Sequence, residues 1–477
     1  MQAWVVDETR TADFGDERLD RRYQLLLDRL SDKPSLSIPA ACQGEAETTA
    51  AYRFFDNERV SYERVLQPHY DATLGRIGQH PVVLIAQDTS EFDLTRREEK
   101  VGGPLNDETR WGLFGHPQLA MTPERLPLGV IGATIWSRDA EEFAKSQAVK
   151  RRERKAKPID DKESFRWVEG YRRACWVAEQ APNTTVVSLA DSEGDIYECF
   201  VEGVSAEGRR AEWIVRACQN RALSEEDRDL RQRLLSTKVL GKLTLQVSQR
   251  DAATGDDRKR KQARTAREAK VSVRAKKVWL RPPPRPGKKL PVVAVNAILV
   301  LEEHPPEGEE PIEWLLLTSL PITVFTEVLT VIDYYCCRWE IEVYFRVLKG
   351  GCRVEDLQLQ TTERLEACLA LYAIVAWRVL HVLMLGRANP EMRCDAVLSE
   401  AEWKAVYQIV TNRQPPSRPP TLGIMVKMIA ELGGYMGRKH DGPPGPKTLW
   451  VGLQRMRDFA VAWARFGPGQ QKRCVQR

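Results

Sequence analysis

Residues 333–349, DYYCCRWEIEVYFRVLK, are the stretch from which the rest of this chain is interpreted. The stretch contains neither proline nor glycine and is long enough for several helical turns. At about 100° per residue, a helix gathers its polar side chains within an arc of roughly 80°: Tyr335, Arg338, Glu342, Arg346 and Lys349. Apolar residues fill most of the remaining surface, whereas an ordinary surface helix has one apolar stripe and a wide polar face. The pattern therefore predicts a largely buried helix with one narrow polar stripe.

The polar stripe places one carboxylate among cations and a phenol. A buried carboxylate needs a compensating partner, and the Arg and Lys side chains need an anion. A metal ion together with a phosphate backbone would satisfy both. The simpler alternative is an intrahelical ion pair between Arg338 and Glu342 at i, i+4, which is common on helices. The apolar surroundings, and two Asp residues upstream, favour the interpretation with metal and phosphate.

Those two Asp residues each follow an apolar run that is typical of a buried strand. The run in residues 81–90 (PVVLIAQDTS) leads to Asp88, and the run in 184–195 (TTVVSLADSEGD) leads to Asp191. A strand end fixes the backbone and leaves the side chain accessible, although a polar residue that starts a turn explains each Asp alone. Carboxylate oxygens suit Mg²⁺ or Mn²⁺. Asp88, Asp191 and Glu342 are therefore a candidate metal site.

Composition limits the other possibilities. A chain of 477 residues is expected to form two or three domains, and its net charge of +5 permits nucleic-acid binding without demonstrating it. The sequence contains no P-loop, no GxSxG and no HExxH motif. The ten cysteines form no metal-binding pattern and suggest a reducing cytosol. We expect no signal peptide, no apolar run of membrane-spanning length and no membrane partner.

Besides the stripe, basic residues gather near the N-terminus, in the charged linker at 138–163 and in residues 220–312. The first 65 residues are expected to be helical, and Arg18, Arg22 and Arg53 could enter a DNA groove or form a solvated helix face. Residues 220–312 are expected to form a β-rich insertion with strands at 240–248 and 292–301. A dense basic segment lies between these strands, and we predict that it is a partly mobile loop that neutralises phosphates. Another strand, 211–217, ends near Arg216, a candidate phosphate contact.

The spacing Tyr335-(2)-Arg338-(3)-Glu342-(6)-Lys349 resembles the Y-R-E-K signature of the IS-four group of bacterial DDE transposases. Trp314 lies 28 positions before Glu342, at the place where relatives carry a Trp that stacks on a flipped base. Taken without the resemblance, Trp314 is better explained as a core residue. The segments DFGDERLDRR, AYRFFDN and LGIMVKMIAELGGYMGRKHD are also similar to the N-terminal and C-terminal regions of the group.

The resemblance implies an α/β fold with a ribonuclease H-like catalytic core, in which a mixed sheet is flanked by helices and interrupted by the β-rich insertion. It implies three domains: a helical DNA-end-binding domain at 1–65, a catalytic domain at 66–360 and a helical dimerisation domain at 361–477. The implied activity is cut-and-paste transposition in the bacterial cytoplasm, on the nucleoid. The DNA partners are the inverted repeats of the transposon ends and the target DNA, held by a homodimer in a synaptic complex.

The resemblance also implies roles for single residues. Asp88, Asp191 and Glu342 would hold two Mg²⁺ ions, with Mn²⁺ as a possible substitute. Tyr335, Arg338 and Lys349, together with the cation Arg346 on the same stripe, would grip phosphates at the transposon end. Trp314 would receive a flipped base and ease a hairpin at the cleaved end. Two alternatives stay open: a catalytically silent DNA-binding protein with structural ion pairs, and a metal-dependent nuclease of the same fold.

Overall fold

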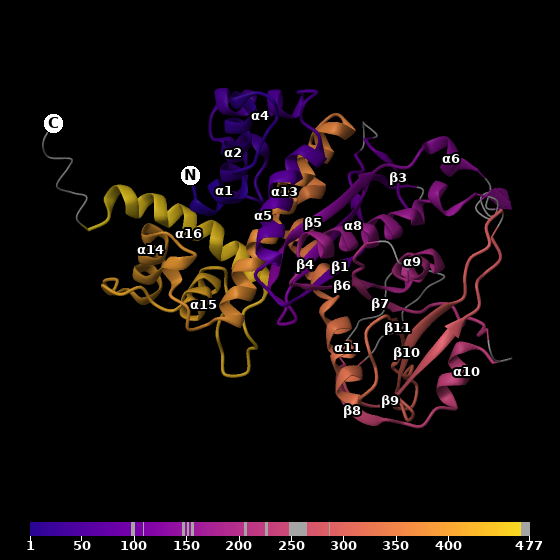
Figure 1. Cartoon of the computed structure of the whole chain (residues 1–477). Coiled ribbons are helices and arrows are strands. Elements are labelled where there is room, and N and C mark those ends of the chain that lie inside the picture. Colours follow the sequence, from indigo (N-terminus) through magenta and orange to yellow (C-terminus); the bar gives the residue numbers. More distant parts are fainter. Residues whose placement is uncertain are drawn as a thin grey trace, which may run out of the picture. The chain divides into compact units, whose positions relative to one another are not determined.

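The computed structural model describes the chain in two compact units, which are considered separately. The first unit comprises Met1–Ser146 and Trp339–Arg477, and the second comprises Gln147–Arg338. Figure 1 shows the elements of both. The described residues are 1–96, 101–107, 109–145, 148–149, 152–153, 157–204, 208–224, 228–247, 265–285 and 287–468.

The first unit begins with helices, as the sequence predicts. They are α1 (Ala3–Glu8), α2 (Glu17–Asp32), α3 (Ile38–Cys42), α4 (Glu45–Phe55) and α5 (Tyr62–Ile77). Asp16 caps α2 by accepting a hydrogen bond from the Arg18 amide. Phe14 packs between Tyr23 and Phe54, with ring centroids 5.4 Å from each, and this aromatic cluster forms the centre of the helical segment.

The strands of the first unit gather around one long central strand. They are β1 (Val82–Gln87), β2 (Ser90–Asp93), β3 (Gly103–Pro104), β4 (Trp111–Met121) and β5 (Pro127–Trp136), followed by α6 (Ala140–Ala144). Strand β4 pairs antiparallel with each of the others. Its residues are almost entirely buried, which fits a strand covered on both faces.

The rest of the first unit is helical. It contains α12 (Glu340–Arg346), a π-helical turn η4 (Val347–Gly351), η5 (Val354–Asp356), α13 (Thr362–Ala388), η6 (Cys394–Ala396), α14 (Glu400–Thr411), α15 (Leu422–Leu432) and α16 (Pro446–Phe466). Helices α15 and α16 approach closely because Gly452 has no side chain: a Cβ there would lie 1.8 Å from the Ile429 carbonyl oxygen.

Helix α13 is apolar on all sides and forms the core of this unit. Among the described residues it is the helix that is long and apolar enough to cross a membrane, and 78% of its most apolar window is buried inside the structure. The expectation that no apolar run reaches this length is therefore wrong. Burial against α2, α5, α12, α15 and α16 explains the composition of α13 as that of a core helix.

The second unit combines a sheet with flanking helices. Its elements are η1 (Ile159–Asp161), η2 (Glu163–Phe165), α8 (Arg166–Gln180), β6 (Thr185–Ala190), η3 (Ser192–Gly194), α9 (Tyr197–Gly203), β7 (Glu212–Arg216), α10 (Leu230–Leu235), β8 (Gly241–Val247), β9 (Arg267–Leu280), β10 (Val293–Leu301), β11 (Glu313–Thr318) and α11 (Phe325–Cys337). The strands run in the order β6-β7-β11-β10-β9-β8, with β6 and β7 parallel and the other pairs antiparallel. The predicted mixed α/β fold is confirmed.

The dense basic segment needs a correction. Residues 267–280, which we predicted as part of a partly mobile loop, form strand β9. Ala269, Val271 and Val273 are buried, whereas Lys270 is exposed. The alternation of apolar residues that is typical of a strand is therefore present, but the many cations in this segment obscure it. The most basic part of the predicted loop, 256–264, lies outside the described residues.

A buried ionic cluster ties the N-terminal helix to the core of the first unit. Arg76 donates to Glu8 through Nη1 (3.0 Å) and Nη2 (2.9 Å). His69 accepts the Val130 amide at Nε2 (2.9 Å) and therefore donates to Glu8 from Nδ1. Burial lowers the pKa of His69 and outweighs the opposing effect of Glu8, so the ring stays neutral. Burial by itself raises the pKa of Glu8, but His69 and Arg76 outweigh it and bring the pKa to about 2.

We expect Glu8→Gln to lower the free energy of unfolding by about 3 kcal/mol at pH 7, because it leaves the partly buried Arg76 without its carboxylate. The pKa of Glu8 is depressed on folding, so its contribution is complete above about pH 5 and is lost as the pH falls towards 2. Urea unfolding at pH 7, 5 and 3 should show the difference from the unmodified protein shrinking in acid. The exposed Glu17→Gln is the control, and a constant difference at all three pH values would contradict the prediction.

Candidate active site and DNA-binding surfaces

Asp88 lies at a break between two strand segments of the first unit. Strands β1 and β2 pair with β4 in one continuous register, so Asp88 faces Pro117, which has no amide hydrogen to offer the ladder. The Thr89 amide donates to Asp88 Oδ1 (2.8 Å), and the Thr89 hydroxyl pairs with Nδ1 of the buried His116 (2.9 Å). The strand therefore ends at the predicted residue, and Asp88 is 8% exposed.

Glu342 lies in the first turn of α12, in the same unit as Asp88. Helix α12 packs against β1 and α13. Its apolar residues Ile341, Tyr344 and Phe345 are buried, and the Tyr344 hydroxyl donates to the Ala373 carbonyl (3.1 Å). Glu342 is half-buried on the remaining side of the helix. The packing of three apolar side chains thus fixes the direction of the carboxylate.

The predicted single helix over 333–349 is wrong in detail. Helix α11 ends at Cys337, α12 begins at Glu340, and the last part of the stretch is the π-helical turn η4. Arg338 and Trp339 keep right-handed helical dihedral angles, and their region uses i→i−3 hydrogen bonds. The boundary between the two units falls between these two residues. The motif is therefore divided between the two units, and its polar side chains do not lie within one arc of roughly 80° on a single helix.

Lys349 lies on the π-helical turn beside the strand that follows Asp88. Its Nζ atom is 3.4 Å from Glu355 Oε1 and 5.4 Å from the centre of the Phe92 ring on β2. The same Glu355 oxygen accepts the Asp93 amide (3.0 Å). Wide π-helical turns occur frequently at functional sites. The first unit thus brings Lys349 next to the Asp88 strand, whereas Arg346 is exposed.

Asp191 directly follows β6 in the second unit. It is half-buried and caps η3 by accepting the Glu193 amide at Oδ1 (2.8 Å). Strand β7 runs parallel to β6 and ends at the exposed Arg216. Because parallel strands end at the same edge of a sheet, Asp191 and Arg216 occupy that edge together.

Tyr335 and Trp314 join this edge. Their ring centroids are 6.0 Å apart with planes inclined at 62°. Burial raises the pKa of the Tyr335 hydroxyl; the nearby Arg338 and Arg216 act to lower it, and Asp191 acts to raise it. Arg338 is also a hydrogen-bond partner of Tyr335. The second unit therefore brings together five predicted site residues, and Trp314, at intermediate exposure, is not a fully buried core side chain.

A hollow of about 260 Å³ opens beside this edge, after β7. Arg216, Cys218, Asn220, Arg231 and Glu313 are among its lining residues. The Arg231 guanidinium donates two hydrogen bonds to the Glu313 carboxylate (2.7 and 2.9 Å), and Arg216 donates to the Glu313 carbonyl (3.3 Å). The two arginines make this hollow positively charged overall, since Glu313 offsets only one of them.

Asp195, four residues after Asp191, has a structural role. Its Oδ2 accepts the amides of Cys218 (2.9 Å) and Gln219 (2.8 Å), and its Oδ1 accepts Arg221 Nε (3.1 Å). This carboxylate fixes the loop that follows β7 and thereby the surroundings of Arg216. The sequence does not reveal this role, because one Asp near a turn resembles another until its partners are known.

The candidate metal ligands are divided between the units: Asp88 and Glu342 lie in the first, and Asp191 lies in the second. Within the part of the chain that the structure describes, no group of three or more His, Cys, Asp or Glu side chains forms a ready metal site. Carboxylate oxygens without His or Cys suit a hard divalent cation. The donor chemistry fits the predicted ions, and the joint site stays a prediction.

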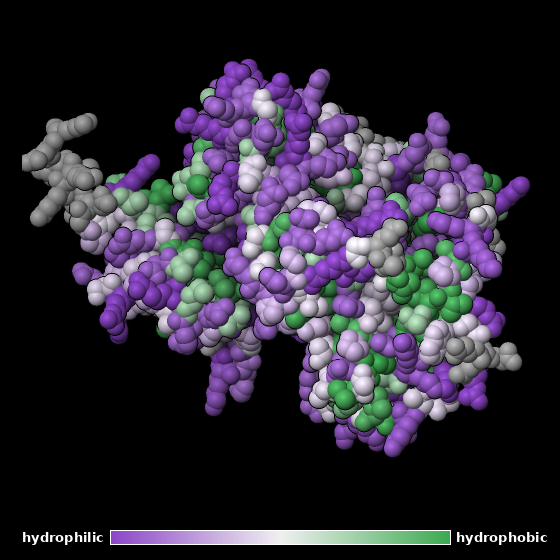
Figure 2. Space-filling view, in the orientation of Figure 1, coloured by the Kyte–Doolittle hydropathy of each residue, from purple (hydrophilic) through white to green (hydrophobic). Residues whose placement is uncertain are grey.

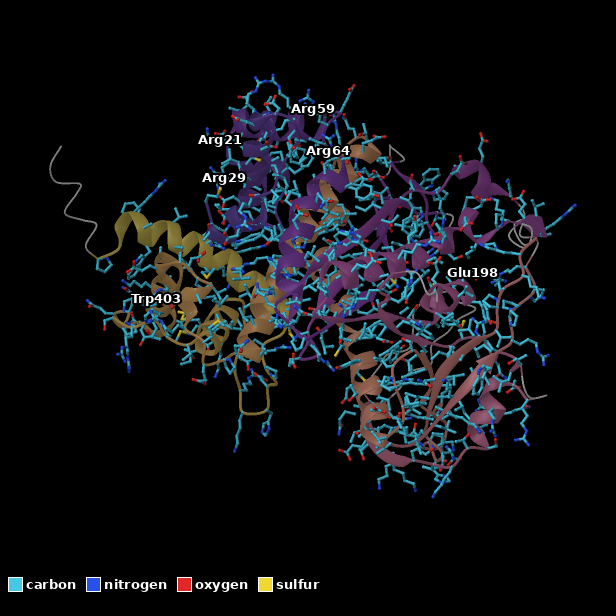
Figure 3. All side chains as sticks on the ribbon, viewed as in Figure 1. Arg21, Arg29, Arg59, Arg64, Glu198 and Trp403 are labelled. Atoms are coloured by element: carbon cyan, nitrogen blue, oxygen red, sulfur yellow. The ribbon has the colours of Figure 1, made fainter. Side chains whose placement is uncertain are left out.

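An exposed stripe of cations follows helix α2. Arg18, Arg21 and Arg29 are exposed at helical spacing, together with Leu25, which lies between the last two. The half-buried Arg22 lies beside them. Figure 3 labels Arg21 and Arg29 on this helix, and Figure 2 shows a mostly hydrophilic surface over α2 and α4. The predicted contact Arg18 is paired with its cap, with Nη2 3.0 Å from Asp16 Oδ2.

Arg53, the third predicted contact of this region, is exposed on α4. Arg21, which belongs to the same basic cluster in the sequence as Arg18 and Arg22, and Arg29 were not predicted as DNA contacts. The 3.6-residue spacing from Arg18 could have revealed both, because it places them on the same side of the helix.

Comparison with known families now decides what kind of protein this is. Residues 1–60 match the transposase DNA-binding family, residues 205–378 match the transposase DDE domain, and residues 374–470 match the dimerisation domain of the transposase Tn5. The chain belongs to the Tn5-like DDE transposases. It is a cut-and-paste transposase, and its α/β core is the ribonuclease H-like fold of the DDE domain.

These matches also establish the general requirements of the transposase. It depends on divalent metal for phosphoryl transfer on DNA, it binds DNA and it forms dimers. Arg216, Trp314, Tyr335, Arg338 and Glu342 lie within the matched DDE segment, whereas Asp88 and Asp191 lie before it. A solved structure, a piggyBac transposase synaptic complex with hairpin DNA, is similar at 9% identity and a TM-score of 0.35, covering 98% of this chain and 79% of that one.

We expect Asp195→Asn to reduce the free energy of unfolding of this transposase by about 3 kcal/mol, because it turns an amide group towards buried donors. Asp191→Asn should cost less than about 1 kcal/mol, since its Oδ1 can still accept the Glu193 amide. Thermal unfolding of the two variants measures the contrast. Equal stability losses would mean that Asp191, like Asp195, is a structural anchor.

Proposed function

We propose that Asp88, Asp191 and Glu342 together hold two Mg²⁺ ions at the catalytic site, with Mn²⁺ as a substitute. The observation that carries this proposal is the position of each carboxylate: two directly follow buried strands, and the third lies on a helix packed against β1. Divalent ions bound there would polarise the scissile phosphate and stabilise the attacking and leaving oxygens.

The remaining residues of the motif position DNA in this proposal. Tyr335, Arg338, Arg216, Lys349 and Arg346 are donors for phosphate oxygens at the transposon end. Arg338 and Arg216 lie close enough to Tyr335 to oppose the rise of its pKa, so the phenol and the cations can grip one phosphate group together.

Trp314 offers an aromatic face at intermediate exposure beside Tyr335. We propose that it stacks on a base flipped out near the cleaved end, which relieves strain in a tight hairpin. The reaction then has four in-line steps: nicking by water, hairpin formation by the freed 3′-OH, hairpin opening by water, and strand transfer into target DNA.

The organisation of the chain follows the same proposal. Residues 1–65 bind the inverted repeat through Arg18, Arg22 and Arg53, with Arg21 and Arg29 added from the stripe on α2. Residues 66–360 carry out catalysis, and residues 361–477 form the dimer that holds two ends in the synaptic complex. The protein works in a bacterial cytoplasm, on the nucleoid.

Glu342→Gln should lower DNA cleavage in Mg²⁺ by at least about 1,000-fold, because a neutral amide is a poor metal ligand. Binding of the same DNA in EDTA should not change. The control is Glu340→Gln, two residues earlier on the same helix, where the carboxylate pairs with Arg125 (3.4 Å). The assay uses a plasmid that carries the DNA flanking both ends of the coding region.

Cleavage that survives Glu342→Gln would disprove the metal site and favour a silent DNA-binding protein. The same assay, with a second plasmid as target, separates transposase from nuclease. Joined products are expected, and persistent cutting without joining would favour the nuclease.

Trp314→Ala should slow hairpin formation roughly tenfold or more, and slow the first nick much less, because the stacked base is needed only for the hairpin. Single-turnover gels that resolve nicked, hairpin and open ends give both rates. Trp314→Phe keeps an aromatic face and should restore part of the hairpin rate. Equal slowing of nicking and hairpin formation would indicate that Trp314 has a structural role and does not stack on a flipped base.

A further inference from the structure

The connection between β9 and β10 is a stiff and strongly basic loop. Residues 281–292, RPPPRPGKKLPV, contain five prolines, and the four that the structure describes (Pro282, Pro283, Pro284 and Pro291) fix φ and favour extended backbone. At its start the Arg281 amide donates to the Ala222 carbonyl (2.9 Å). The loop, called here the β9–β10 loop, is therefore held in place where it leaves the sheet.

Helix α9 anchors this loop at both ends and in its middle. The Tyr197 hydroxyl lies 3.0 Å from the Leu280 carbonyl, before the loop, and 2.8 Å from the Pro291 carbonyl, near its end. Glu198, labelled on α9 in Figure 3, accepts Nε (2.7 Å) and Nη2 (3.1 Å) of Arg285. Burial alone would raise the pKa of Glu198, but the bonds from Arg285 lower it, so the pair stays charged at neutral pH. Such a bidentate pair fixes the geometry of the loop.

The anchor uses only one of the cations of the loop. Arg281, Lys288 and Lys289 are exposed, and so is Lys277 on β9. None of these four cations has a carboxylate partner among the described residues. The Lys277 amine lies 5.9 Å from the ring of Trp279, a strand residue with 38% exposure. A rigid scaffold that presents exposed cations without carboxylate partners is suited to the sugar-phosphate backbone of nucleic acid.

Sheet register relates this surface to the Trp314 edge. Trp279 pairs with Ala294 and Trp314 pairs with Val300, so both tryptophans project from the same face of the sheet in the second unit. Six residues of β10 separate the two pairings, or about 20 Å along the strands. This length corresponds to about six base pairs at ~3.4 Å each.

We propose that the β9–β10 loop, together with Lys277 and Trp279, is a second contact for duplex DNA, which it grips through phosphates. The contact rests on the DNA-binding activity of the transposase and not on the proposed metal site. Its test is therefore run in EDTA, where failure of the metal site has no effect.

The test replaces the four exposed cations in the full-length protein: Lys277→Gln, Arg281→Gln, Lys288→Gln and Lys289→Gln. Fluorescence anisotropy with a labelled duplex of about 30 base pairs, of unrelated sequence, is measured between 50 and 300 mM KCl. Each phosphate contact adds about 0.9 to the salt slope, so the slope should fall by about 3 to 4. A matched control removes the same charge from exposed C-terminal positions: Arg413→Gln, Arg418→Gln, Lys427→Gln and Lys447→Gln.

An unchanged salt slope, or an equal fall in the control, would overturn the proposal. A lost preference for duplex over a single strand of the same sequence supports it, whereas a fall seen only with the single strand overturns the duplex assignment. Glu198→Gln tests the anchor: it adds net positive charge, which by itself strengthens DNA binding, but it releases Arg285. Weaker duplex binding by a fully folded Glu198→Gln protein supports the fixed loop, and equal or tighter binding overturns that part.

Discussion

Burial of the apolar sides of α11 and α12 is the constraint on which the candidate site depends. Val328, Val331 and Ile332 bury one side of α11, and Ile341 and Phe345 do the same for α12. The polar side chains of these helices must then lie on the sides of the helices that are not buried. A helix that was polar all round could turn and lose its register, whereas a helix fixed by apolar packing holds its charged groups in defined directions.

The interruption between the helices adds a second constraint. The backbone stays helical through Arg338 and Trp339, but the hydrogen bonds tighten there and widen again in η4. Tyr335 and Arg338 belong to the second unit and Glu342 and Lys349 to the first, so one short stretch supplies charged groups to both.

The sequence allowed some of this to be predicted, for physical reasons. The strand ends at Asp88 and Asp191 were predictable because long apolar runs followed by turn residues leave few other structures. The helix break was not, since no glycine or proline marks it and tertiary packing decides it. Strand β9 was hidden because its five cations are as numerous as the apolar residues that it buries. The site role of Trp314 came from resemblance, because its sequence context fits a core residue better, whereas Glu342 was already indicated by its position on a narrow polar stripe.

The carboxylates of the chain fall into two groups according to what surrounds them. Glu8, Asp195 and Glu198 are buried and accept hydrogen bonds from arginine, histidine or backbone donors. Removing such a carboxylate leaves its donors without an acceptor. An acid of this kind cannot bind a metal ion without giving up its partners. Asp191 and Glu342 are only half-buried and lie on elements that other residues hold in place. The anchoring acids thus provide the rigidity that a metal site needs.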